Sequence, residues 1–271
     1  MRRMDAAMIS RLGTGVIGFL VLLTASRPEA APVSVKLSEG SVRGFVVVRS
    51  LDGHAIAYGE MLQHPKEGAL ESRLLLNFDD GSVYDETVTF SQAQVFTVQA
   101  YRLRQHGPSF PTSEISFDRK TRRFQARVQE KKGAAEQTAS GDLEMPPDLY
   151  NGMTLVLIKN LRPGETADVK MAAFMPKPRL ITMHLQPEGE ESALLGAHPK
   201  KVIRYVVKLE IGGLTGALAS LLGKQPADLH YWFVPGDLPA FAKFEGPMFL
   251  NGPIWRLELA TLGWRTKDPG R

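Results

Sequence analysis

Histidine is the side chain best suited to bind metals and to transfer protons at neutral pH, and the chain contains six. Neighbouring histidines are separated by 10 to 78 residues, and none belongs to an HExxH motif or another close metal-binding pair. The absence of cysteine excludes thiolate ligands, cysteine nucleophiles and disulfides. We therefore predict no metal site and no cofactor. The histidines, which we interpret as surface or locally hydrogen-bonded residues, are His54, His64, His106, His184, His198 and His230.

Serine and glycine motifs for hydrolysis or phosphate binding are also missing: the chain has no GxSxG, no GxxxxGK[ST] and no GxGxxG. Ser109 stands between prolines, where a nucleophile turn would need a following helix. The glycines of residues 212–216 lack the lysine of a phosphate-binding loop and are interpreted as a turn. An enzyme is therefore the less favoured reading, and a hydrolase whose residues meet only in the folded chain is the third functional hypothesis.

Two charged clusters have simple structural explanations. Asp79-Asp80 and Asp85-Glu86 flank an Asp-Gly turn and could attract calcium, but the turn itself explains them. The basic residues of 119–123 could contact an anionic envelope surface, but we interpret them as a solvated turn. Neither cluster is assigned a function.

Aromatic residues crowd the last forty residues of the chain. They can serve as core filler, or they can line a concave apolar pocket if the sheet is partly open. The second reading predicts a ligand site on the concave face, and the residues assigned to it are Tyr205, Val207, Leu218, Trp232, Trp255 and Leu257.

Most of the chain has the composition of short strands separated by turns. Asp52-Gly53 and Asp80-Gly81 are strong hairpin signals, because both residue types tolerate positive φ. In residues 201–211, apolar and polar side chains alternate, as in a sheet with one dry face. Strands are predicted at residues 42–49, 54–62, 71–78, 83–90, 95–105, 114–118, 123–129, 167–174, 179–186, 201–211, 228–234, 241–249 and 253–260.

Two helices are predicted between these strands. Pro146-Pro147 and Asp148 suit a helix start, apolar residues then recur at helical spacing, and Arg162-Pro163-Gly164 ends the segment. Residues 214–222 read as a short apolar helix closed by Gly223. The expected fold is mainly β, a strongly curved antiparallel sheet or half-barrel that wraps one or two helices; a closed β-barrel or a β-sandwich is the alternative.

The first 30 residues have the form of a secretion signal, with arginines followed by an apolar run over residues 12–25. That run is short for a membrane-spanning helix, which needs about 20 apolar residues. We expect cleavage between residues 26 and 31, a single β-rich domain over residues 31–265, and a periplasmic or secreted location. The membrane would be contacted only through an uncleaved signal.

The overall charge of +4 falls to about +2 without the arginine-rich signal, too little for a nucleic-acid-binding surface.

Several segments of the mature chain resemble a family of uncharacterised exported bacterial proteins. The resemblance implies a curved sheet, then a helix, then more sheet. This plan is also similar to that of periplasmic domains of unknown function shaped like the lipoprotein-localisation carriers. The resemblance implies no catalytic residues. The segments that carry it are GDLEMPPDLYNGM from Gly141, MPKPRL from Met175, KVIRYVVKLEIGG from Lys201, FEGPMF from Phe244 and GPIWR from Gly252.

The leading functional hypothesis is an exported, non-enzymatic binding or carrier protein for an apolar or amphipathic, lipid-like ligand. The alternative is a structural or assembly factor of the cell envelope that pairs with another protein through a sheet edge.

Overall fold

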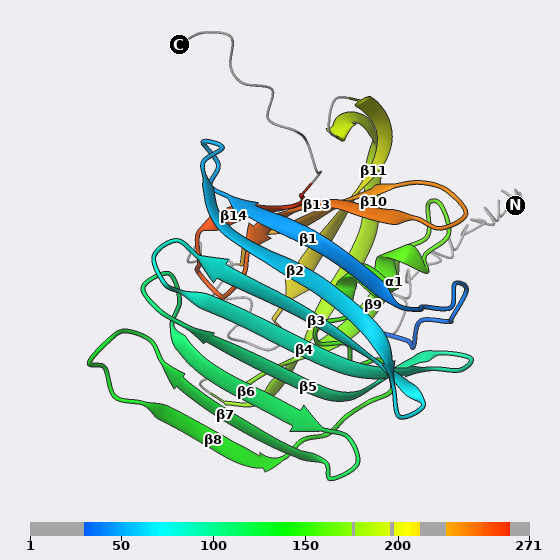
Figure 1. Ribbon diagram of the computed structural model, residues 1–271. Coiled ribbons are helices and arrows are strands. Elements are labelled where there is room, and N and C mark those ends of the chain that lie inside the picture. The colour runs from blue at the N-terminus through cyan, green and yellow to red at the C-terminus, as the bar shows by residue number, and fades with distance from the viewer. Residues whose placement is uncertain (1–29, 175–176, 196–197, 212–225, 261–271) are drawn as a thin grey trace, which may run out of the picture.

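One antiparallel sheet contains all the named strands of this computed structural model, which describes residues 30–174, 177–195, 198–211 and 226–260. Within these residues the sheet has fourteen strands in the order β8-β7-β6-β5-β4-β3-β2-β1-β14-β13-β12-β11-β10-β9 (Figure 1). The sheet is not closed, since β8 and β9 are its two edges. The mainly β, curved antiparallel architecture is confirmed.

The strand bounds show how closely turn residues and alternation locate the strands. The first eight strands are β1 (Val42–Arg49), β2 (Ala55–Lys66), β3 (Ala69–Phe78), β4 (Val83–Gln92), β5 (Phe96–His106), β6 (Thr112–Asp118), β7 (Arg123–Gln129) and β8 (Gln137–Asp142). The remaining six are β9 (Ala167–Ala173), β10 (Arg179–Leu195), β11 (His198–Glu210), β12 (Leu229–Val234), β13 (Ala240–Pro247) and β14 (Ile254–Leu259). β8 was not predicted, and β10 extends well beyond its predicted end.

The Asp-Gly turns form as expected. Gly53 and Gly81 have φ values of 93° and 83°, which glycine adopts without the steric cost that a Cβ would impose. At the second turn, the backbone N–H of Phe78 donates to the carbonyl of Ser82 at 2.9 Å. The turn therefore fixes the register between β3 and β4.

Strong curvature brings the two halves of the sheet face to face. Phe174 directly follows β9. Its ring centroid lies 5.4 Å from that of Phe124 on β7 and 6.1 Å from that of Phe117 on β6. A close approach between β2 and β3 accompanies the bend: a Cβ at Gly59 would lie 1.9 Å from the carbonyl oxygen of Leu75. The sheet thus encloses a single large hydrophobic core on its concave side.

The helix inside this concavity is shorter than predicted. α1 spans only Thr154–Lys159, whereas residues 146–153 are not helical. The backbone there pairs with the edge of β9 instead: the N–H of Tyr150 donates to Lys170 O, and the N–H of Lys170 donates to Asp148 O, both at 2.8 Å. Pairing with an open strand edge satisfies the same groups that a longer helix would have satisfied. Residues 146–161 are called the α1 segment below.

The two sheet edges differ in their protection. The outer edge of β9, with which no other described strand pairs, is covered by the α1 segment and by Ala31. The N–H of Ala31 donates to Asp168 O at 3.1 Å. The outer edge of β8, within the described part of the chain, pairs with no other segment. β8 is short, polar and mostly exposed, which is a common way to blunt an edge.

Some expectations lie outside the described residues. These are the signal over residues 1–29, the second helix at residues 214–222 and the last residues of the chain, from 261 onward. In the part that is described, no helix is long and apolar enough to cross a bilayer.

Candidate functional site

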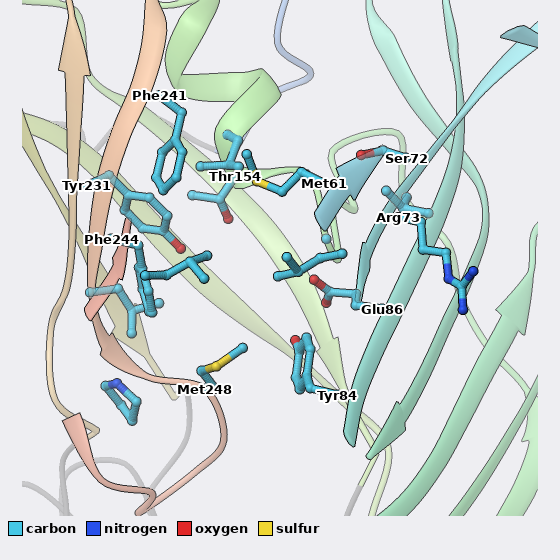
Figure 2. Close-up of a pocket in the computed structure, with 17 residues that line it drawn as sticks. Met61, Ser72, Arg73, Tyr84, Glu86, Thr154, Tyr231, Phe241, Phe244 and Met248 are labelled. Atoms are coloured by element: carbon cyan, nitrogen blue, oxygen red, sulfur yellow. The ribbon is translucent and has the colours of Figure 1, made fainter. Parts of the chain in front are cut away.

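An interior cavity lies between the two halves of the sheet, next to the start of α1. Its volume is about 220 Å³. β2, β3 and β4 form one wall, β12, β13 and β14 form the facing wall, and the α1 segment closes one side (Figure 2). The lining residues are Met61, Ser72, Arg73, Leu74, Tyr84, Glu86, Val88, Gly152, Thr154, Leu155, Leu229, Tyr231, Phe241, Phe244, Pro247, Met248 and Leu257.

Strand β4 places one carboxylate in this apolar surface. Side chains alternate between the two faces of a strand, so Tyr84, Glu86 and Val88 share the concave face of β4, and all three line the cavity. Tyr84 and Val88 are only 6% and 2% exposed, and the half-buried Glu86 lies between them. Glu86 therefore occupies a position whose neighbours on the strand belong to the core.

Two tyrosines hold the Glu86 carboxylate. The hydroxyl of Tyr101, on β5, donates to Glu86 Oε1 at 2.8 Å, and the nearby Tyr84 hydroxyl also lowers the pKa of this carboxylate. Burial raises the pKa of Glu86 above its usual range, and the two hydroxyls lower it only in part. Burial, together with the nearby Glu86 charge, also raises the pKa of both tyrosines, so both stay protonated donors at neutral pH.

No cationic side chain among the described residues forms an ion pair with Glu86. Arg73 lines the same cavity, but its guanidinium donates to the carboxylate of Asp85 at 2.7 and 3.0 Å. Figure 2 shows this guanidinium directed away from the centre of the cavity. Glu86 thus faces the cavity with hydroxyl partners and no positive charge.

The facing wall is aromatic. The ring centroid of Tyr231, on β12, lies 5.0 Å from that of Phe244 on β13. Burial is the main reason that the pKa of Tyr231 is raised; the nearby Thr154 side chain partly offsets this rise, and the Glu86 charge adds to it. Figure 2 shows Tyr231 and Glu86 pointing toward one another from opposite walls.

A second cavity, of about 210 Å³, lies at the far end of α1. Its two lysines are already paired: Lys159 Nζ lies 2.6 Å from Glu39 Oε2, and Lys36 forms an ion pair with Glu165. Asn160 Oδ1 accepts the backbone N–H of Lys36 at 2.9 Å. The carboxylate that lines this cavity, Asp237, is exposed to solvent, unlike the half-buried Glu86.

Buried polar side chains fix the α1 segment against the strands around it. The Tyr150 hydroxyl accepts the N–H of Val33 at 3.0 Å and donates to Phe96 O at 2.9 Å. The Asn151 side chain accepts the N–H of Ala172 at 2.8 Å and donates to its carbonyl at 2.9 Å. The wall that α1 contributes to the first cavity is therefore rigidly placed.

Arg119 also anchors this segment, although its basic run was interpreted as a solvated turn. Its guanidinium donates to the carbonyl oxygens of Val98, Met145 and Pro146 at 2.5, 2.7 and 3.1 Å. Partial burial lowers its pKa. The acidic cluster behaves as a turn at Asp80, whose carboxylate accepts the Ser82 N–H at 2.8 Å and the Ser109 hydroxyl at 2.7 Å.

The predicted ligand residues occupy several places. Leu257 lines the first cavity, Tyr205 lines the second, and Val207 is fully buried in the core. Trp255 packs against Phe78 with ring centroids 5.1 Å apart, and Leu218 lies outside the described residues.

Trp232 belongs to a small separate cluster with Val202 and Ala242, away from the main core. There the Lys243 ammonium lies 3.6 Å from the centre of its ring. Trp232 therefore lines neither cavity.

Glu86 is the site residue that the sequence reasoning missed. It was considered only with Asp85, as part of an acidic cluster beside a turn. Its signal was the alternation of residues 84–90, in which Tyr84, Val88 and Phe90 share a face with this glutamate. A charged residue in register with a dry strand face marks a buried polar site.

Histidine and carboxylate groups meet at several points, at His54, His64, His184 and His230, and His184 contacts two carboxylates. His184 Nδ1 lies 2.8 Å from Asp168 Oδ1, and its Nε2 lies 2.8 Å from Glu210 Oε2. The His184 cluster does not line either of the cavities described above. No group of three or more potential ligands among the described residues is arranged to hold a metal ion.

Comparison with known proteins adds little to this picture. No family model matches the chain, and no curated protein matches it. Among solved structures, the chain is similar to a beta-barrel-like protein of the domain of unknown function DUF1849 from Brucella abortus, with 9% sequence identity and a TM-score of 0.42. The similarity covers 86% of this chain and 98% of that protein. At this level of similarity, a shared function does not follow.

Proposed function

We propose that the protein is a non-catalytic binding or carrier protein that holds an amphipathic ligand in the cavity between β2–β4 and β12–β14. The observation that carries this proposal is an apolar, partly aromatic cavity with one convergent polar group, the Glu86 carboxylate with its tyrosines. Such a combination is typical of ligand sites.

The size of the cavity limits the ligand. Sites for drug-sized molecules measure about 300–1,000 Å³, whereas this one measures about 220 Å³. The ligand we propose is a compact amphipath or one short acyl chain with its head group, rather than a two-chain lipid. Export through the amino-terminal signal would place this binding activity in the cell envelope.

The residues around Glu86 support binding better than catalysis. A hydrolytic site needs a nucleophile next to a general base, but the lining residues include no histidine, lysine or cysteine. Ser72 and Thr154 are its hydroxyl-bearing aliphatic residues.

A larger side chain at a residue that lines the cavity tests this proposal. Leu155→Trp should weaken binding of a neutral fluorescent probe, N-phenyl-1-naphthylamine, by about tenfold or more, because the indole would occupy the space of the probe and steric exclusion of about 1.4 kcal/mol corresponds to tenfold in affinity. Leu238→Trp is the matched control, since Leu238 is 78% exposed and lies away from the cavity. Equal affinity in both variants, or no saturable binding by the unmodified protein, would rule out the cavity as a ligand site.

A second candidate function is structural, through strand pairing at the uncovered outer edge of β8. An edge of this kind can accept a strand from another chain, and a second copy is the simplest partner. Sedimentation over a wide concentration range, combined with hydrogen exchange of the β8 amides, tests it. A monomer at every concentration with unprotected β8 amides argues against self-pairing.

A further inference from the structure

We propose that the ligand carries a protonated amine, and that its ammonium group binds directly to the Glu86 carboxylate while its apolar part lies between the two walls. This inference rests on the binding function proposed above and names the chemical class of the head group.

Among the described residues, no cationic side chain forms an ion pair with the Glu86 carboxylate. A buried carboxylate is stabilised by an opposite charge or by several hydrogen-bond donors. Glu86 has tyrosine hydroxyls from Tyr101 and Tyr84, but the one arginine that lines the cavity is bound to Asp85. A cation delivered by the ligand would supply the partner that the described residues do not.

Aromatic side chains surround the cavity space in front of the Glu86 carboxylate. Tyr84, Tyr231 and Phe244 line the space in front of Glu86, and Figure 2 shows Tyr231 on the opposite wall. The faces of aromatic rings attract ammonium groups within about 6 Å of the ring centre. A carboxylate beside aromatic rings therefore favours a cation over a neutral or anionic head group.

The charge of Glu86 also determines which sign of charge the ligand head group can carry. An anionic head group, such as a fatty-acid carboxylate, would face Glu86 across a cavity with no free cation among its lining residues. The only cationic lining residue, Arg73, is neutralised by Asp85. Like charges in this low-dielectric space repel strongly, so the same cavity excludes fatty acids.

The experiment compares three probes of equal chain length, octylamine, octanol and octanoate, as competitors of N-phenyl-1-naphthylamine at pH 7.5. A charge-assisted contact contributes about 1.5–3 kcal/mol, which corresponds to about 10- to 100-fold tighter binding of the amine than of the alcohol. Octanoate should bind more weakly than octanol.

Two variants locate the effect. Glu86→Gln keeps the shape of the side chain and should reduce the amine-to-alcohol preference to within about threefold, because the contact with an ionised carboxylate is lost. Glu114→Gln is the control, as it makes the same change at an exposed residue on β6 that is bonded to Arg104 at 2.9 Å.

The pH dependence on the unmodified protein gives a second reading that needs no variant. The groups facing Glu86 are Tyr84 on its own strand, Tyr101 on β5, Tyr231 on β12 and the Arg73–Asp85 pair beside it. Amine binding should strengthen as pH rises and Glu86 ionises, whereas alcohol binding should stay nearly constant.

The outcomes separate the two proposals. Equal binding of amine and alcohol, or a preference for the amine that survives in Glu86→Gln, overturns the head-group inference and leaves the cavity function in place. Alcohol affinity that falls as pH rises would also overturn it, because Glu86 would then bind as a protonated donor. Failure of every probe to bind overturns the cavity function together with the inference.

Discussion

The two sides of the α1 segment treat buried polar groups in opposite ways. On the anchored side, the Asn151 side chain satisfies two backbone groups of Ala172 on β9, and the Tyr150 hydroxyl satisfies the N–H of Val33 and the carbonyl of Phe96 on β5. Toward β4, the Glu86 carboxylate meets tyrosine hydroxyls and a cavity, with no cationic partner among the described residues. The first arrangement stabilises the fold, and the second leaves an incompletely satisfied charge that a ligand can complete. Substitutions on the two sides should therefore differ in both the size of their effect and its dependence on pH.

The largest effect is expected on the anchored side, at Asn151. Asn151→Ala leaves the N–H and carbonyl of Ala172 without partners in a buried position, and it should lower the free energy of unfolding by about 2–4 kcal/mol. Urea unfolding measures this change. Asn77→Ala, at an exposed position on β3, should stay within about 0.5 kcal/mol; a similar loss in both variants would refute the anchoring role.

A somewhat smaller effect is expected at Tyr150. Burial is the main cause that raises its pKa to about 12, so its hydroxyl is protonated at neutral pH. Tyr150→Phe removes only that hydroxyl and should cost about 1–3 kcal/mol, because the N–H of Val33 and the carbonyl of Phe96 lose their partner. Tyr58→Phe is the control at a residue that is 54% exposed, and an equal cost at both positions would contradict the assignment.

On the cavity side, Glu86→Gln should affect stability less and in a pH-dependent direction. Burial raises the pKa of Glu86 in the folded state, so the folded protein binds more protons than the unfolded chain above the unfolded pKa of about 4.3. The unmodified protein should lose stability as pH rises from that value through the folded pKa. The glutamine variant lacks this loss and should gain relative stability over the same interval.

Unfolding curves from pH 4 to 8 measure this difference. Parallel profiles for Glu86→Gln and the unmodified protein would show that Glu86 is not strained by burial, and the contrast with the anchored side would fail. Glu114→Gln again controls for the removal of one carboxylate.

The smallest effect is expected at His184, outside both regions. Partial burial lowers its pKa, but hydrogen bonds with Asp168 and Glu210 outweigh this and raise it overall. Stability from this cluster is fully present below the unfolded pKa of about 6.5 and is lost as pH rises through the folded value.

Because the imidazole is 28% exposed, we expect His184→Gln to cost less than about 1 kcal/mol at pH 6, and nothing measurable at pH 9. Chemical unfolding at the two pH values tests this. The same substitution at exposed His106 controls for a surface imidazole, and a loss at pH 9 as large as that at pH 6 would contradict the charge-based explanation.

Much of the sheet was predictable because most strands carry local signals. β1 and β7 have the bounds expected from sequence, since turn residues flank both and their apolar residues mark a buried face. β8 was missed because Gln137–Asp142 has no apolar alternation; only pairing with β7 makes it a strand. The length of α1 was overestimated because Leu149 and Met153 are buried at helical spacing. The backbone of this segment instead forms hydrogen bonds with the edge of β9.

The cavity was harder to predict than the sheet. Residues of β4 and β12 are brought together only by the curvature of the whole sheet. A local sequence pattern can show which side chains point inward, but it does not predict which of them are in contact. Glu86 was readable as an odd charge on a dry strand face, but its lack of a cationic partner depends on Arg73 pairing with Asp85 on the other side. That information exists only in three dimensions.

The unequal protection of the two borders limits how copies of this chain could associate. Endless filaments of sheet proteins require a free border at each end, so that every added molecule offers a new one. Here the α1 segment covers β9, so strand addition at β8 would use one edge of each molecule and join two of them as a symmetric pair. In such a pair both β8 edges are consumed and both β9 edges stay covered, so these two edges offer no route to a fibre.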